Sequence, residues 1–377
     1  MLSVYLHIPF CKSKCPYCDF FSVAENHPVF AEYPALLEQH MTLAIRRQDW
    51  SGPVSTIYFG GGTPSLLDPA SVGAVLSAID RQLGIADDAE ISMEANPGTL
   101  SPGRLKGYRT AGVNRLSLGL QTQNPRQLRS LGRLHGRTEN RQAVQWARQA
   151  GFHNLSLDLM FALPGQTLSD LQADISEYTH LSPEHLSCYG LTAEAGTPLD
   201  VSVRQGRVVL PDGDSYAESF LCLHEGLEDA GYQHYEIANY ARPGFTCRHN
   251  FGYWQRQSGL GLGAGAHSFR PLGWGERWTV ANDLDAYRSA VRHDRYPSEL
   301  LERYDRRTAM GETLYLGLRT RNGVEERQFQ ETFGITVAEA YPEEIRQLSP
   351  QLECRDGVWR FQPESWLLFD RLIQGFL

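Results

Sequence analysis

The chain has 377 residues, of which 41% are hydrophobic and 21% charged, and its formal net charge is −9 at pH 7. This composition is ordinary for a globular protein with room for two domains, and the acidic charge argues against a nucleic-acid partner or an anionic membrane bound through a general electrostatic field. Seven cysteines without a disulfide framework, no signal peptide and no run of about 18 apolar residues predict a cytoplasmic protein with at most peripheral membrane contact.

Strand-like runs alternate with helix-like segments over the first 190 residues or so. The strands are predicted at residues 4–9, 56–60, 90–96, 115–121, 154–161 and 185–191. Apolar residues from Phe30 to Ala44 recur at helical spacing between the first two strands. Further helices are expected at about 69–83, 101–111, 124–150 and 168–181. Six β-then-α units predict a parallel sheet covered by helices, which with strong curvature gives a partial, TIM-like (β/α)6 barrel, two units short of the full eight.

The loop after the first predicted strand carries the most informative motif, in which Cys11, Cys15 and Cys18 are spaced C-x3-C-x2-C. A cubane iron–sulfur cluster is normally held by four cysteine thiolates. Three clustered thiolates would leave one iron open to an outside ligand, and an open iron is a reaction site. Structural zinc with His7 as the fourth ligand is the main alternative, but no second ligand pair follows the motif. The other cysteines are scattered, and most are expected to fill the core.

Polar or glycine-rich motifs follow the ends of the predicted strands. Parallel α/β folds bind ligands at the carboxyl ends of their strands, so the motifs predict one shared pocket. Besides the cysteines, its candidate residues are Gly61, Gly62, Thr63, Glu94, Gln121, Arg133, Asp158 and Gly190. The glycine run at 60–62 lets backbone groups approach a ligand closely, and a phosphate-binding loop would need a Gly-Lys-Ser/Thr ending that is absent. A structural bond from Asp158 to Arg115 or Arg133 is the alternative for that carboxylate.

The pattern changes after about residue 200. A helix is expected near 214–230, followed by an irregular stretch up to about 280. Within this stretch the run 261–267 formally fits the dinucleotide-binding pattern G-x-G-x-x-A, but Pro271 and neighbouring glycines stand where a helix should begin. We interpret this run as a loop that closes over the pocket.

The last part of the chain, from about residue 300, reads helix, turn, helix and then a hairpin folded at Asp356-Gly357. A final helix would carry Trp366 and Ile373. This order resembles a winged helix, although the local excess of acidic residues argues against DNA binding, so we expect a structural role or a cover for the site. The predicted domains are a partial barrel at 1–200, a barrel-closing and linker region at 201–299, and a smaller α+β, winged-helix-like domain at 300–377.

Together these motifs resemble the HemN/HemW group of radical S-adenosylmethionine (SAM) proteins, also described as oxygen-independent coproporphyrinogen oxidase-like. The likeness runs along nearly the whole chain, and it is carried by the segments 5–11, 61–65, 94–98, 112–115, 131–135 and 158–160. The resemblance implies that Cys11, Cys15 and Cys18 hold a [4Fe–4S] cluster with SAM on the fourth iron. An electron from the cluster would then cleave SAM to methionine and a 5′-deoxyadenosyl radical, a step that the cofactor performs and the protein directs.

The resemblance also implies the residues that would surround SAM. Direct contacts are expected from Tyr5, Gly61, Gly62, Thr63, Glu94, Gln121, Arg133, Asp158 and Gly190, with Tyr17 and His267 close by. Two departures from the group, Ala162 where glycine is usual and Thr122-Gln123 where an aromatic residue often follows Gln121, are expected to be tolerated.

The chain is most similar to the HemW branch of this group, whose members are heme chaperones that deliver heme to respiratory enzymes. Coproporphyrinogen oxidases carry a fourth cysteine where this chain has Phe20, and they have a longer N-terminal extension. This chain instead has the HNxxYW motif of HemW at residues 249–254. The resemblance therefore implies heme binding and transfer to apo-hemoproteins, with oxygen-independent oxidation of coproporphyrinogen III as the alternative.

Three points stay open from the sequence alone. His249 beside aromatic rings could ligate heme iron, or it could be a hydrogen-bonded core histidine. The cluster could be only structural, in which case the protein would bind without cleaving SAM. Formation of a homodimer is not decided by the sequence.

Overall fold

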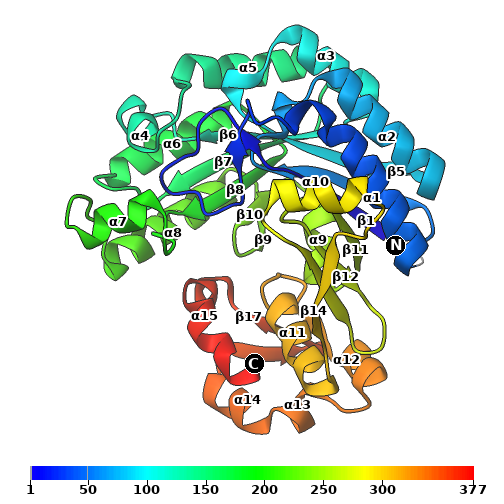
Figure 1. Ribbon diagram of the computed structural model, residues 1–377. Coiled ribbons are helices and arrows are strands. Elements are labelled where there is room, and N and C mark those ends of the chain that lie inside the picture. Colours follow the sequence, from blue (N-terminus) through cyan, green and yellow to red (C-terminus); the bar gives the residue numbers. More distant parts are fainter. Residues whose placement is uncertain (1, 49) are drawn as a thin grey trace.

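The computed structural model describes residues 2–48 and 50–377. Within these residues the main sheet has the strand order β14-β13-β12-β11-β1-β4-β5-β6-β7-β8-β10-β9, and it curves beneath an outer arc of helices (Figure 1). Its centre consists of the strands β1 (Leu2–Ile8), β4 (Val54–Gly61), β5 (Ile85–Ala95), β6 (Arg115–Gln121), β7 (Leu155–Phe161) and β8 (His185–Gly190). Each is parallel to the next, so the partial (β/α)6 barrel is confirmed.

Most helices of the arc begin after a residue whose side chain caps the first turn. The helices are α1 (Tyr33–Gln48), α2 (Pro69–Leu83), α3 (Pro102–Ala111), α4 (Pro125–Ser130), α5 (Arg137–Gln149) and α6 (Leu168–His180). At the start of α2 the Asp68 carboxylate accepts from the backbone N–H of Ser71, with proline in the first turn. The single helix expected at 124–150 is wrong: α4 and α5 are separate, because Gly132 adopts φ +70° and residues 131–136 form a loop. That loop carries Arg133.

Both edges of the barrel sheet are extended by residues beyond 200. Beyond β8 lie β10 (Asn239–Ala241) and β9 (Gln233–Glu236), which follow the helices α7 (Pro198–Arg204) and α8 (Gly213–Asp229). The other edge carries β11 (Ser258–Leu262), β12 (His267–Arg270), β13 (Glu276–Val280) and β14 (Ser298–Arg303). Two helices, α9 (Arg248–Trp254) and α10 (Leu284–Arg292), complete this region.

The glycine run at 261–267 is therefore not the closing loop that the sequence suggested. Gly261 and Leu262 belong to β11, which pairs in parallel with β1. A Cβ on Gly261 would lie 2.1 Å from the carbonyl oxygen of His267, so the returning strand β12 needs glycine here. The strand was hidden because alternate glycines leave no pattern of apolar side chains. A strand followed by an antiparallel strand also excludes the dinucleotide-binding context.

The C-terminal domain lies apart from the helical arc in Figure 1 and combines small helices with a three-stranded sheet. Its elements are α11 (Arg306–Gly317), β15 (Val324–Glu325), α12 (Glu326–Phe333), α13 (Val337–Ala340), α14 (Pro342–Leu348), β16 (Leu352–Arg355) and β17 (Val358–Phe361). The hairpin turns at Asp356 and Gly357, both with positive φ, as the Asp-Gly pair predicts. The last helix is instead three short pieces, the 3₁₀ helix η4 (Pro363–Leu368), α15 (Phe369–Leu372) and the 3₁₀ helix η5 (Ile373–Phe376).

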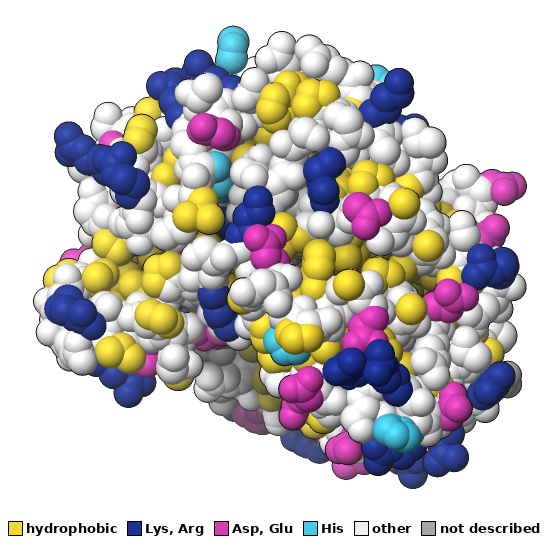
Figure 2. Space-filling view, turned by 45° about the horizontal axis from the view of Figure 1, so that its top comes forward, with side chains coloured by type: hydrophobic (Ala, Val, Ile, Leu, Met, Phe, Trp, Pro, Cys, Tyr) yellow, Lys and Arg dark blue, Asp and Glu magenta, His cyan; other side chains and the backbone are white. Residues whose placement is uncertain are grey.

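One large hydrophobic core joins the barrel to the C-terminal domain, and a smaller apolar cluster around Leu131, Met160 and Leu191 packs against Tyr17. In residues 2–48 and 50–377, no helix combines the length and apolar character needed to cross a membrane. On the face shown in Figure 2, acidic and basic side chains are interspersed among hydrophobic and uncharged ones.

Candidate functional site

A cavity of about 540 Å³ lies at the carboxyl ends of the parallel strands. The structure brings twelve of the residues singled out from the sequence to its wall: Cys11, Cys15, Tyr17, Cys18, Gly61, Gly62, Thr63, Glu94, Gln121, Arg133, Asp158 and Gly190. Three others do not line it. Tyr5 is hydrogen-bonded to His7, His267 is exposed and hydrogen-bonded to Thr279, and His249 is buried elsewhere in the barrel.

The cysteine loop is held between two short strands, β2 (Phe10–Cys11) and β3 (Val23–Ala24), which pair in parallel. Within the loop the N–H of Cys18 donates to the carbonyl of Cys15 over 3.1 Å. All three thiols of the motif are partly exposed, and burial raises the pKa of Cys18. The loop therefore presents three thiols at the mouth of the cavity.

The zinc alternative has no support from His7. Its ring is 5% exposed, and its two nitrogens are hydrogen-bonded to the Tyr5 hydroxyl and to the carbonyl of Phe21, each over 3.0 Å. Among the described residues, no three His, Cys, Asp or Glu side chains converge on a point suited to a single metal ion. Thiolates of a cubane each bind a different iron, so they do not need to converge in this way.

The glycine loop at the end of β4 presses against the cysteine loop. Gly61 has φ +109°, and a Cβ there would lie 2.7 Å from the His7 ring. A Cβ on Gly62 would lie 2.8 Å from the carbonyl oxygen of Phe10, and the Gly62 N–H donates to the carbonyl of Ile8 over 2.9 Å. These glycines are thus required by contacts within the protein, and they fix the two loops against each other.

Two of the carboxylates that line the cavity lie on strands, Glu94 on β5 and Asp158 on β7. Burial, assisted by the charge of Asp158, raises the pKa of Glu94 to about 7, and burial raises the pKa of Asp158 to about 6. Glu94 accepts from the Tyr58 hydroxyl over 3.0 Å and from the Gly61 N–H over 3.2 Å. Asp158 accepts from the Ser117 hydroxyl over 3.0 Å.

Neither arginine that could have bonded Asp158 does so. Arg115 donates to Asn154 over 2.6 Å and Arg133 to the Tyr17 hydroxyl over 2.9 Å. The Nε of Arg133 is buried without a hydrogen-bond partner in the described part of the chain. An unpaired buried guanidinium nitrogen is costly, and a ligand acceptor in the cavity would relieve that cost.

Gln121 occupies a strained position beside these groups. Its φ is +68°, which is uncommon for a residue other than glycine, and such strain gathers at functional sites. A Cβ placed on Gly119 would lie 3.0 Å from Gln121 Nε2, 3.7 Å from the Arg133 guanidinium and 3.8 Å from an Asp158 oxygen. An amide, a cation and a carboxylate therefore meet at one point of the wall.

The donor set fits the cofactors that the motifs imply. Three thiols at the mouth suit a cluster with one open iron. SAM carries an ammonium, a sulfonium and a carboxylate. The wall offers the strand carboxylates of Glu94 and Asp158 and, in Arg133, a guanidinium with an unused N–H.

The HNxxYW motif forms helix α9, which is anchored inside the barrel. The backbone N–H groups of Arg248 and His249 both donate to Glu90 over 3.1 Å. His249 is 1% exposed, and burial lowers its pKa to about 3, so its ring is neutral at pH 7. Its nitrogens are hydrogen-bonded to Thr56 and Tyr253 over 2.8 and 3.0 Å. Heme coordination by His249 would require one of these bonds to break.

Several residues of the cavity wall were not predicted as site residues, among them Ser117, Tyr189 and Glu194, while Phe20 was noted only as a departure from the oxidases. Phe20 is 62% and Tyr189 45% exposed, so both present an aromatic face at the mouth. The period-2 alternation of β6 could have found Ser117, since it lies on the same face of the strand as Gln121. No comparable signal marks Glu194, because it lies in a loop.

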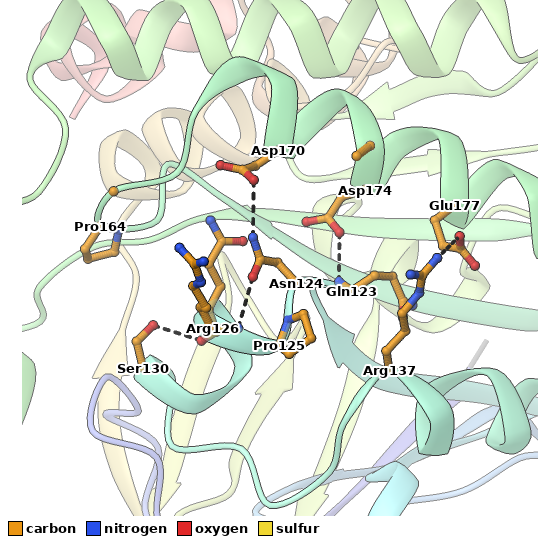
Figure 3. A pocket seen from close by; sticks show the side chains of 13 residues that line it. Gln123, Asn124, Pro125, Arg126, Ser130, Arg137, Pro164, Asp170, Asp174 and Glu177 are labelled. Atoms are coloured by element: carbon orange, nitrogen blue, oxygen red, sulfur yellow. Dashed lines mark hydrogen bonds and ion pairs between the residues drawn. The ribbon is translucent and has the colours of Figure 1, made fainter.

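A second cavity, of about 680 Å³, lies outside the barrel between α4 and α6 (Figure 3). Its carboxylates already have partners within the protein. Asp174 accepts from the N–H of Gln123 over 2.8 Å, Asp170 accepts from Asn124 over 3.2 Å, and Glu177 is paired with Arg137. These contacts fix the loops after β6 and β7, and none of the residues predicted for the site lines this cavity.

Comparison with known proteins defines the class of this chain. Residues 5–177 match the Radical SAM superfamily, and residues 304–368 match the HemN C-terminal domain. The structure of coproporphyrinogen III oxidase (HemN) from Escherichia coli, a radical SAM enzyme, has a TM-score of 0.83 over 100% of this chain and 89% of that chain, with 21% sequence identity. The fold is therefore that of a radical SAM protein with a HemN-type C-terminal domain, and this superfamily implies a [4Fe–4S] cluster and SAM.

Sequence relatives narrow the class further. The chain is 34% identical over 350 residues to the heme chaperone HemW of Lactococcus lactis subsp. lactis. The aligned region covers 93% of this chain and 89% of that protein. It is 41% identical over 271 residues to the heme chaperone HemW of Escherichia coli (strain K12), and this alignment covers 71% of this chain and 69% of that protein. The chain belongs to the HemW family.

Proposed function

We propose that this protein binds heme and transfers it to apo-hemoproteins, respiratory enzymes among them, and that it works in the cytoplasm with at most peripheral contact to a membrane. The proposal is carried by the 34% identity over 93% of the chain to a curated heme chaperone. Phe20 supports it, because an exposed aromatic side chain stands at the cavity mouth where coproporphyrinogen oxidases have a fourth cysteine.

We further propose that Cys11, Cys15 and Cys18 hold a [4Fe–4S] cluster and that SAM occupies the cavity. When bound, the cluster supplies the electron for reductive cleavage of SAM. Arg133 would pair with the carboxylate of SAM, while Glu94 and Asp158 would face its positive groups. Hydrogen bonds within the protein hold these side chains: Arg133 donates to Tyr17, Glu94 accepts from Tyr58 and Gly61, and Asp158 accepts from Ser117.

Heme titration of the anaerobically reconstituted protein, followed by absorbance, tests the proposal. We expect a saturable Soret band at about one heme per chain, and transfer of that heme to an apo-hemoprotein in a second step. His249→Ala tests the assignment of that residue as heme ligand, and Cys11→Ala separates effects of the cluster. An unchanged heme spectrum in His249→Ala would remove His249 from the heme site.

The alternative is oxidation of coproporphyrinogen III without oxygen. An anaerobic assay with SAM, a reductant and coproporphyrinogen III distinguishes the two functions. Stoichiometric conversion to the divinyl product by the reconstituted protein would overturn the chaperone proposal. Absence of 5′-deoxyadenosine under the same conditions would instead indicate a cluster with only a structural role.

A further inference from the structure

Helix α9, whose residues His249 and Gly252 are buried, packs against β4 near the start of that strand and away from the cavity mouth. The ring of His249 is hydrogen-bonded to Thr56 of β4 and packs against the ring of Tyr58 on the same strand, with centroids 5.1 Å apart and an interplanar angle of 26°. Thr56 and Tyr58 are two residues apart, so both side chains point to the inner face of β4. The motif histidine therefore lies directly against a side chain that reaches toward the cavity.

Tyr58 packs against two other rings, those of His249 and Tyr5. Besides His249 it packs against Tyr5, with centroids 6.2 Å apart and an interplanar angle of 23°. The rings of Tyr5 and His249 are themselves 6.4 Å apart, so the three rings form one cluster. Aromatic pairs in this arrangement contribute free energy beyond that of burying their surface, so they favour one orientation of the Tyr58 ring. The third contact of His249, the hydrogen bond to Tyr253, fixes its own ring plane. The orientation of Tyr58 is thus set by a cluster that combines one ring from α9 and one from β1.

The hydroxyl of Tyr58 ends at a residue of the cavity wall. It donates to one carboxylate oxygen of Glu94 over 3.0 Å, while the other oxygen accepts from the Gly61 N–H over 3.2 Å. With both oxygens engaged, the carboxylate has one orientation. These bonds also oppose the effect of burial on the pKa of Glu94, so they favour the ionised form that attracts a cationic ligand.

We propose that His249 and Tyr58 are positioning residues for Glu94, and that the HNxxYW motif thereby sets the affinity of the cavity for SAM. This inference rests on the proposed binding of SAM in the cavity. It gives the motif histidine a role that requires no coordination of heme iron, in agreement with a ring that is 1% exposed and hydrogen-bonded at both nitrogens.

The test measures equilibrium binding of SAM to the reconstituted full chain under anaerobic conditions, with the EPR spectrum of the reduced cluster as a second readout. Tyr58→Phe keeps the stacked ring and removes only the hydroxyl. Loss of a hydrogen bond to a charged group corresponds to an affinity about 10–100-fold lower, and the SAM-induced change in the EPR spectrum should be reduced in parallel. His249→Ala should weaken SAM binding about 5–10-fold through loss of the ring contact.

Two further variants separate positioning from general damage. Tyr232→Phe removes another buried hydroxyl, which donates to the carbonyl of Pro183 over 2.7 Å far from Glu94, and should leave SAM affinity within about twofold of wild type. His249→Gln can still bond Thr56 and Tyr253, so it should retain most of the affinity. The double variant of Tyr58→Phe with His249→Ala should lose less than the product of the two single effects, because both act on one carboxylate.

The outcomes distinguish this inference from the function on which it rests. Iron-loaded wild type that binds no SAM would overturn both. Wild type that binds SAM, together with Tyr58→Phe of equal affinity, would overturn the positioning role alone. The role would also be refuted if His249→Ala, with normal iron content, lost heme binding but kept the SAM affinity of wild type.

Discussion

Gly62 is the position at which the structure makes its sharpest prediction. An added Cβ would lie 2.8 Å from the carbonyl oxygen of Phe10, 2.9 Å from its nitrogen and 3.0 Å from the Cys11 sulfur. Two of these neighbours are backbone atoms of β2, so a side-chain rotation cannot relieve the contact. Gly62→Ala must therefore move the glycine loop away from the strand that carries the first cysteine of the motif.

The size of the effect follows from the packing. Forcing a methyl group into a filled site costs about 1–3 kcal/mol, and here the displacement also moves one of three thiols relative to the others. Gly103→Ala provides the matched control, because Gly103 lies in α3 and a Cβ added there would have no neighbour within 4 Å. In a helix this change should stabilise the protein by about 0.4–1 kcal/mol.

Urea unfolding of the apo proteins and iron content per chain after anaerobic reconstitution check this reasoning. Gly62→Ala should unfold at a lower urea concentration than wild type and retain less iron, whereas Gly103→Ala should match or exceed wild type in both. If Gly62→Ala had the unfolding midpoint and the iron content of wild type, the close packing of the two loops would be refuted.

Two further results are expected. Glu94 should contribute stability to the apo protein that is lost as the pH rises from about 4.5 to 7, because burial raises its pKa from 4.5 to about 7 and the folded state keeps a proton that the unfolded chain has released. Buried histidines such as His40 and His249, whose pKa values are lowered, act in the opposite direction, so the quantity to measure is the difference in free energy of unfolding in urea between wild type and Glu94→Gln. This difference should shift against wild type as the pH rises over this range, and a difference that does not change with pH would refute the prediction. Arg319 lies over the ring of Trp254 at 4.7 Å and over that of Phe369 at 5.4 Å, and so joins α9 to the C-terminal domain. Arg319→Ala should weaken this contact by about 1–2 kcal/mol and make limited proteolysis faster. Equal proteolysis rates in Arg319→Ala and in Arg371→Ala, a control at an exposed site, would contradict the prediction.

Local signals in the sequence were sufficient for most of the barrel. Strand β6 was predicted with its observed bounds, and α2 was predicted from Pro69 to Leu83, because an aspartate-proline start and a glycine end mark it. Two of the failures depend on glycines. Strand β11 is built from glycines that leave no periodic pattern, and the break between α4 and α5 depends on the conformation of Gly132, which packs against Pro16 of the cysteine loop.

The candidate site was predictable to the extent that it lies at the strand ends. Glu94, Gln121 and Asp158 are polar residues near the carboxyl ends of apolar strands, so the parallel arrangement alone places them together. The position of His249 could not be found in this way. Its partner Thr56 is 193 residues away in the sequence, and only the tertiary fold brings α9 into the barrel.

Two carboxylates of β5, Glu90 and Glu94, connect the HNxxYW motif to the cavity. Glu90 and Glu94 are on the same face of β5, and at about 3.4 Å per residue they are roughly 14 Å apart. Glu90 accepts hydrogen bonds from two backbone N–H groups of α9. Glu94 accepts one from the hydroxyl of Tyr58, whose ring packs on His249. A buried carboxylate is tolerated only with its donors in place. Helix α9 supplies those donors directly to Glu90 and orients one for Glu94, so a displacement of this helix affects both carboxylates at once.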